Sequence, residues 1–198
     1  AYQLNNFKKN DSIKNSNLSK IAYEGYQLKD SVFFLKTNLE AQKLSIKLRD
    51  TLGIGNTHWS YGMYYLEQEL NDSAYYHYYE AYKYFQVAKH EFFVGKMLYN
   101  MAIIQKDVKD YMGSEVLTFQ AISIFKKLQK YNDLYRCYNL LGIIFNEIQE
   151  YDKAILYHTE ALENLENVEQ KETYKESSLN NLGLVYQNKE DYKKAITY

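Results

Sequence analysis

The residues that most often carry chemistry in proteins are few in this sequence and widely spaced. The four histidines are His58, His77, His90 and His158, and none of them belongs to an HExxH motif or another paired metal-binding spacing. The single cysteine, Cys137, lies in a helical pattern, where a small buried apolar side chain is the main interpretation and a reactive thiol the alternative. We therefore predict no metal site, no cofactor and no catalytic residue.

Motifs for nucleotide binding and nucleophilic catalysis are also missing. The nearest glycine-rich segment, LGIG at 52–55, lacks the Lys-Ser/Thr pair of a phosphate-binding loop, and we interpret it as a turn between structural units. No GxSxG or serine–lysine signature occurs. These observations predict that the segment is not an enzyme, and a catalytic role would need a partner domain outside it.

The composition favours a helical protein with a substantial core. The 198 residues are 46% hydrophobic, and 24 basic residues nearly balance 25 acidic ones, so the basic surplus of a typical nucleic-acid binder is absent. No run approaches the roughly 18 apolar residues that span a bilayer. The chain contains no proline, which favours helices joined by short polar turns.

The sequence repeats with a period of about 40 residues. Ala161 has counterparts at Ala121, Ala81, Ala41 and Ala1, at equal steps of one period. A second ladder in the same register joins Gly142 to Ala102, Gly62 and Ala22, and continues at Gly183. Two parallel ladders of small residues indicate a repeated structural unit.

Each unit has the pattern of two helices separated by a short polar turn such as QEYD at 149–152. The small residues are predicted to lie where the two helices approach closely, because interaxial distance depends on the side chains at the contact. The predicted map has a partial second helix at about 1–12, repeats near 15–54, 55–94, 95–134 and 135–175, and a partial repeat at 176–198. Both ends fall inside a unit, so we expect a single repeat-array domain over 1–198 that is a fragment of a longer protein.

The repeats resemble tetratricopeptide (TPR) repeats. The best-matching unit has Leu141-Gly142, Phe145, Tyr151, Ala154 and Ala161-Leu162 at the expected positions, with Tyr138 where the family usually has Trp. Two features depart from the family pattern: the proline that usually ends each unit is missing, and the period is longer than the usual value of about 34 residues. The resemblance implies an all-α fold, a right-handed superhelix (α-solenoid) of antiparallel helix pairs. The long period is similar to that of TPR sensory regions of bacterial regulators.

In this family the first helices line the inner, concave surface, where peptides bind. The repeat register places a mixture of amides, aromatic side chains and charges on that surface, which suits an extended peptide. The alternatives are core packing for the single tryptophan, an ordinary surface charge for the two basic residues, which are one period apart, and solvated amides for the asparagines. The predicted peptide-binding residues are Trp59, Lys96, Tyr99, Arg136, Asn139, Asn146, Asn180 and Gln187.

The leading functional hypothesis is a non-catalytic module that binds a peptide or a partner protein's segment in this groove. The resemblance implies the sensory or scaffolding part of a bacterial signalling or transcription regulator, with a kinase or DNA-binding output domain outside the chain. No direct contact with nucleic acid and no membrane segment are expected. The alternative hypothesis is a structural array that self-associates by end-to-end stacking of repeats.

Overall fold

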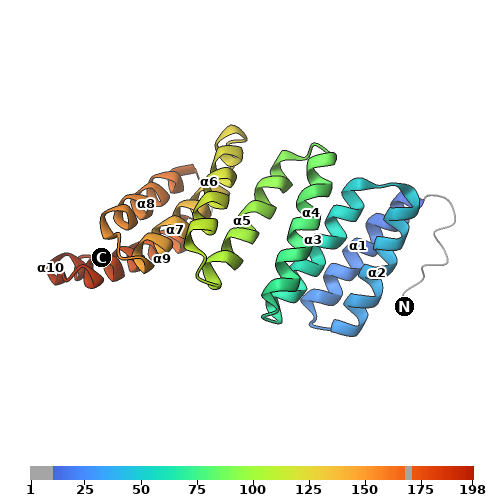
Figure 1. The fold of residues 1–198 in the computed structure, drawn as a ribbon, viewed down its shortest axis with the longest axis horizontal. Coiled ribbons are helices and arrows are strands. Elements are labelled where there is room, and N and C mark those ends of the chain that lie inside the picture. Colours follow the sequence, from blue (N-terminus) through green and yellow to red (C-terminus); the bar gives the residue numbers. More distant parts are fainter. Residues whose placement is uncertain (1–10, 168–170) are drawn as a thin grey trace. The chain divides into compact units, whose positions relative to one another are not determined.

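The computed structural model describes residues 11–167 and 171–198, and the chain there is helical with no strand (Figure 1). The expected all-α array of antiparallel helix pairs is confirmed. The helices are α1 (Asp11–Gln27), α2 (Ser31–Leu48), α3 (Thr51–Glu67), α4 (Asn71–Val87), α5 (Glu91–Asp107), α6 (Tyr111–Lys127), α7 (Tyr131–Glu147), α8 (Tyr151–Glu163), α9 (Lys171–Asn188) and α10 (Tyr192–Ala195), with a short 3₁₀ helix η2 (Asn164–Asn167) after α8.

The turns between helices recur at half the sequence period. A residue with positive φ occurs at every turn between consecutive α-helices except the α8–α9 connection, part of which lies outside the described residues, and the set is Lys29, Arg49, Glu69, Lys89, Lys109, Gln129, Gln149 and Glu190. After α3, the amide of Glu69 donates to the carbonyl of Leu66 and the amide of Leu70 donates to that of Tyr65, which is the Schellman pattern of hydrogen bonds. This short turn reverses the chain and fixes the helix length.

Aspartate side chains start several of the helices. The Asp50 Oδ1 atom accepts a hydrogen bond of 2.9 Å from the amide of Gly53, and Asp30, Asp110 and Asp191 cap α2, α6 and α10 in the same way. Because Asp50 caps α3, the segment LGIG at 52–55 lies within the first turns of that helix. Our interpretation of 52–55 as a turn between units was wrong, since the chain reverses at Arg49 instead.

The helix pairs begin at positions 11, 51, 91, 131 and 171, which is about one helical turn before the predicted repeat starts. In α3 the side chain of Asp50 caps the helix and starts it before the predicted repeat. Residues 1–10 of the predicted partial helix at 1–12 lie outside the described residues, and Asp11 and Ser12 belong to α1.

Most small residues of the two ladders are buried, as predicted, whereas Gly183 is only half-buried and Ala1 lies outside the described residues. Ala22, Ala41, Ala102 and Ala161 are all fully buried. A Cβ atom added to Gly142 would lie 2.5 Å from the Cε1 atom of His158 on α8.

At Gly62 the same addition would come 2.5 Å from the Cδ1 atom of Tyr78 on α4. Glycine thus stands in the first helix at these two positions because the second helix places a ring against its backbone.

The chain divides into two compact units, residues 1–97 and 98–198, and the division falls within α5. In the first unit α1 packs on α2, α3 packs on α4, and α3 also contacts both α1 and α2. In the second unit α7 packs against α6, α8 and α9, and α10 folds back on α9. No helix in the described ranges is long and apolar enough to cross a membrane.

Candidate pocket between α1 and α3

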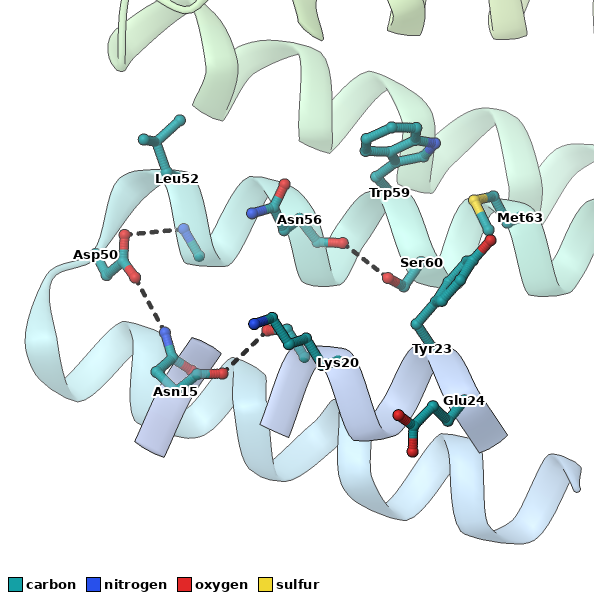
Figure 2. A pocket seen from close by; sticks show the side chains of 12 residues that line it. Asn15, Lys20, Tyr23, Glu24, Asp50, Leu52, Asn56, Trp59, Ser60 and Met63 are labelled. Carbon is teal, nitrogen blue, oxygen red and sulfur yellow. Dashed lines mark hydrogen bonds between the residues drawn. The ribbon is translucent and has the colours of Figure 1, made fainter. Parts of the chain in front are cut away.

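A pocket of about 850 Å³ lies in the first unit between the first helices of two successive pairs, α1 and α3 (Figure 2). Both helices turn one face toward it, because residues three and four apart share a helix face. The pocket is lined by three residues of α3 that the repeat register places on the groove: Asn56, Trp59 and Met63. The complete lining is Asn15, Ser19, Lys20, Tyr23, Glu24, Asp50, Leu52, Gly53, Asn56, Trp59, Ser60 and Met63.

One end of the pocket is a polar cluster built around Asn15, which is almost fully buried. Its Nδ2 atom donates to Ser45 Oγ at 2.8 Å. The same atom donates to Asp50 Oδ2 at 3.0 Å (Figure 2). The Asn15 Oδ1 atom has no hydrogen-bond partner. A buried acceptor without a donor is unfavourable by about 1–3 kcal/mol.

Gly53 makes this cluster possible. A Cβ atom at this position would overlap Asp50 Oδ2 and would lie 2.6 Å from Ser45 Oγ. The carboxylate therefore occupies the space that any larger residue would fill.

The other end of the pocket is apolar and aromatic. Figure 2 shows Trp59, Met63 and Tyr23 together at this end. The Trp59 ring is supported from behind by Phe85 of α4 and Phe93 of α5, with ring centroids 6.5 and 5.4 Å away. A rigid aromatic wall with exposed surface suits an apolar side chain of a ligand.

Charged and hydroxyl groups lie between the two ends. Lys20 and Glu24 project from α1, and Ser60 of α3 donates its hydroxyl hydrogen to the carbonyl of Asn56 at 3.0 Å. The pocket therefore offers an apolar surface, both charges, and amide donors and acceptors within one trough.

Only one other predicted binding residue lies in the first unit. The Lys96 ammonium on α5 lies 5.5 Å from the centroid of the Phe92 ring, a cation–π arrangement. Lys96 is absent from the lining of the α1–α3 pocket.

Two of the predicted binding residues, Tyr99 and Arg136, contact other side chains of the second unit. Tyr99 of α5 packs against the core cluster of Ala102, Leu140 and Ile144, and burial raises the pKa of its hydroxyl. Burial lowers the pKa of the Arg136 guanidinium, but the hydrogen bond with Tyr174 of α9 and the charges of Tyr99, Tyr174 and Asp133 together outweigh it, and the net direction is upward.

The predicted asparagines of α7 pair with asparagines of α9. Asn139 Oδ1 accepts from Asn181 Nδ2 at 2.9 Å, and Asn146 Oδ1 accepts from Asn188 Nδ2 at 3.1 Å. The partner of Asn139 is thus Asn181, next to the predicted Asn180. Asn180 and Gln187 are exposed on α9. Each bonded amide still has unused donor and acceptor positions.

The sequence patterns missed α1 as a wall of the pocket, because Asn15, Lys20 and Tyr23 lie in the unit with the weakest repeat match. They also missed a contact between two histidines. His58 Nδ1 of α3 lies 3.0 Å from His77 Nδ1 of α4, and His58 Nε2 lies 3.2 Å from Gln42 Nε2 of α2. The two histidines lie at similar distances in sequence from the α3–α4 turn, and hairpin geometry brings such positions together.

Burial lowers the pKa of both rings, and that of His77 falls to about 4. Both imidazoles are therefore neutral at pH 7. Within the described part of the chain, no three His, Cys, Asp or Glu side chains are grouped as metal ligands.

No protein-family model matches the sequence, and no curated protein matches it. Solved structures do match its fold. BtubC (BKLC) from P. vanneervenii is 21% identical, with a TM-score of 0.86 over 98% of this chain and 82% of that one. RapI in its apo form is 16% identical, with a TM-score of 0.83 over 93% of this chain and 67% of that one.

Aspartyl phosphate phosphatase F from Bacillus subtilis is 16% identical, with a TM-score of 0.75 over 97% of this chain and 59% of that one. At these identities the likeness concerns fold alone. Together with the repeated helix pairs, it shows that the chain has a TPR-type helical-repeat fold.

Proposed function

We propose that the protein is a non-catalytic binding module that holds a peptide, or an extended segment of a partner protein, in the α1–α3 pocket. The pocket itself is the observation that supports this most strongly. It joins the aromatic surface of Trp59 to the polar cluster around Asn15 along one trough. An extended peptide carries both apolar side chains and regularly spaced backbone N–H donors, so it can meet both ends at once.

The amide pairs of α7 and α9 support a further contact surface in the second unit. Asn139 and Asn181 share one hydrogen bond, which orients both amides and leaves donors and acceptors for a ligand backbone. Arg136, Asn146, Asn180 and Gln187 lie on the same two helices. In this proposal each unit has its own contact surface: the α1–α3 pocket binds ligand side chains in the first unit, and the asparagine pairs bind main-chain groups in the second.

The biological role proposed is that of the sensory or scaffolding part of a bacterial regulator. The similar folds of RapI and of aspartyl phosphate phosphatase F support this role, together with the long repeat period. Ligand binding would act by shifting the population of packing states of the helix pairs, which an attached kinase or DNA-binding domain would sense.

Trp59 is the only tryptophan, so its fluorescence tests the proposal directly. A library of random heptapeptides is screened for binding, and the tightest binder is titrated against the wild-type protein. Ser60→Phe fills the trough with a ring and should weaken binding at least about tenfold, the equivalent of about 1.4 kcal/mol. The matched control Ser123→Phe, at an exposed position of α6, should bind like the wild type.

If no peptide in the library changes Trp59 emission or binds by calorimetry, the proposed function is wrong. If peptides bind equally well to the wild type and to Ser60→Phe, the module binds peptides but not in this pocket.

Self-association is the second candidate. Ile196, Tyr192 and Leu184 on or beside the last two helices are 87, 60 and 48% exposed, and such apolar surface can pack against another copy. Sedimentation over a range of protein concentrations distinguishes the two functions, because only the self-associating array changes its mass with concentration.

A further inference from the structure

The contact between His58 and His77 lies outside the α1–α3 pocket and takes no part in the proposed peptide binding. It joins three helices through Gln42 of α2, His58 of α3 and His77 of α4. Aromatic rings surround it: Tyr84 stacks on His58, Tyr65 stacks on His77, and Tyr76 meets His77 edge-on. Both histidines are only partly buried, so small solutes reach them from solvent.

The spacing of the two Nδ1 atoms is that of a pair of metal ligands. A zinc ion with tetrahedral geometry and Zn–N bonds of about 2.0–2.1 Å holds two imidazole nitrogens about 3.3 Å apart. The observed separation is 3.0 Å along a hydrogen bond, so the two rings must rotate until both Nδ1 atoms point to the ion, with only a small increase in their separation. The two residues belong to adjacent helices of one hairpin, which fixes their backbones.

The hydrogen between the two rings must be placed elsewhere when a metal ion binds. A metal ion binds an imidazole nitrogen that carries no hydrogen, and in the metal-free protein one of the two Nδ1 atoms donates a hydrogen bond to the other. The hydrogen that the two Nδ1 atoms share in the metal-free protein would move to the far nitrogen of its ring. No net proton is lost in that exchange near neutral pH.

Gln42 provides the outer contact that metal-bound histidines normally have. With both Nδ1 atoms on the metal, His58 carries its hydrogen on Nε2, which faces the amide of Gln42. A rotation of that amide presents its oxygen as the acceptor, and such a contact fixes the tautomer and the ring orientation.

The charged groups around the pair have opposite effects. The negative charge of Glu80 raises the pKa of both histidines, and the positive charge of Lys83 lowers the pKa of His58. Lys83 is itself ion-paired with Glu80 at 2.5 Å. A divalent ion at the histidines competes with Lys83 for this carboxylate.

We propose that His58 and His77 bind a borderline divalent transition-metal ion of the zinc class through their Nδ1 atoms, with water in the remaining positions and Gln42 orienting His58. Imidazole nitrogen suits zinc, copper and nickel, whereas calcium and magnesium prefer oxygen ligands. The bound ion ties α2, α3 and α4 together outside the α1–α3 pocket.

The test uses zinc chloride and the full chain, with the dissociation constant measured by competition against a chromophoric chelator. His77→Phe keeps an aromatic ring among the tyrosines but removes a ligand, and it should weaken zinc binding by about a hundredfold. Gln42→Leu should weaken it by about tenfold, as changes to an outer-shell contact commonly do. His90→Gln removes a histidine that is not part of the pair, and it should bind like the wild type.

Cobalt adds a spectroscopic readout. The wild type with Co²⁺ should show the visible absorption bands of nitrogen-ligated cobalt, and His58→Gln and His77→Gln should lose them. The glutamine variants also replace the phenylalanine variant if that one does not fold.

The proposal is overturned if zinc does not bind the wild type, or if His77→Phe and His77→Gln bind it as tightly as the wild type does. The second result would mean an adventitious ion only. Equal stabilisation by magnesium and zinc would also contradict an imidazole site.

Discussion

At the scale of single residues, the fold depends on two glycine–ring contacts. Gly62 faces Tyr78 in one helix pair, and Gly142 faces His158 in another, two sequence periods further along the chain. In each case the ring occupies the space that a Cβ atom would need. The sequence repeat identifies the glycines as packing positions, but only the structure shows which side chain each one admits.

Gly142→Ala should therefore destabilise the protein by about 1–3 kcal/mol through overpacking, although alanine is the better helix former. Adding His158→Ala should restore part of this loss, with a coupling energy of about 1 kcal/mol in the double-mutant cycle. Urea unfolding monitored by circular dichroism measures both quantities.

Gly183→Ala is the matched control, because its new Cβ atom meets nothing closer than 3.5 Å. It should be neutral or stabilise by up to about 1 kcal/mol. A loss in Gly183→Ala as large as that in Gly142→Ala would mean that the clash with His158 is not the cause.

His158 also makes stability depend on pH. Burial lowers its folded-state pKa to about 4, from 6.5 in an unperturbed histidine, and its Nδ1 atom has no hydrogen-bond partner. Between these two pKa values the unfolded chain binds a proton that the folded chain does not. The free energy of unfolding should therefore fall as the pH is lowered through this window, by about 2 kcal/mol between pH 7.5 and 5 for this residue.

Urea midpoints at pH 7.5, 6 and 5 measure this effect. His158→Gln should show a shallower decline than the wild type, and the remaining slope should come from groups such as His58 and His77. A decline of the same steepness in both proteins would exclude His158 as a source.

At the scale of the helices, the turns include a backbone conformation that is unfavourable in free energy for the residues that adopt it. The positive-φ residues are lysine, arginine, glutamate or glutamine at every turn described, and none of them is glycine. For residues other than glycine this conformation costs roughly 1–2 kcal/mol. The capping hydrogen bonds and the packing of the two helices must offset that cost at each turn.

Gln129→Gly in the α6–α7 turn should stabilise the protein by about 0.5–1 kcal/mol, because glycine removes the strain but loses more entropy on folding. Gln120→Gly, at an exposed interior position of α6, is the control and should destabilise by about 1 kcal/mol. Thermal and urea unfolding give the two signs. If Gln129→Gly destabilises the protein, the glutamine side chain stabilises the turn by more free energy than the backbone strain at this position costs.

The helices themselves were predictable in kind and order. The repeat of small residues and the apolar spacing indicate paired helices, and the structure confirms them. The first residue of each helix pair could not be predicted to within one helical turn. A capping side chain such as Asp50 starts its helix about one turn before the predicted start of the repeat. Because Asp50 caps α3, the segment at 52–55 is helical, whereas the sequence had indicated a turn.

At the scale of the whole molecule, the chain consists of two compact units, each of which has its own potential contact surface. The first unit contains the α1–α3 pocket, and the second contains the paired asparagines of α7 and α9. The α1–α3 pocket is lined by Trp59, which the repeat register predicts as a binding residue, and by Asn56 and Met63 on the same face of α3. The repeat register could not show that Asn15 of α1 completes the pocket, or that Asn139 pairs with Asn181, because periodicity defines faces and not individual partners.

The central claim is that a peptide binds between α1 and α3. Nuclear magnetic resonance of the isotope-labelled protein with the tightest heptapeptide from the library tests it most directly. The amide and side-chain signals of Asn15, Lys20, Trp59 and Met63 should shift on titration, in parallel and with one dissociation constant. Shifts that spare these residues and fall instead on the outer faces of α4 and α6 would contradict the claim.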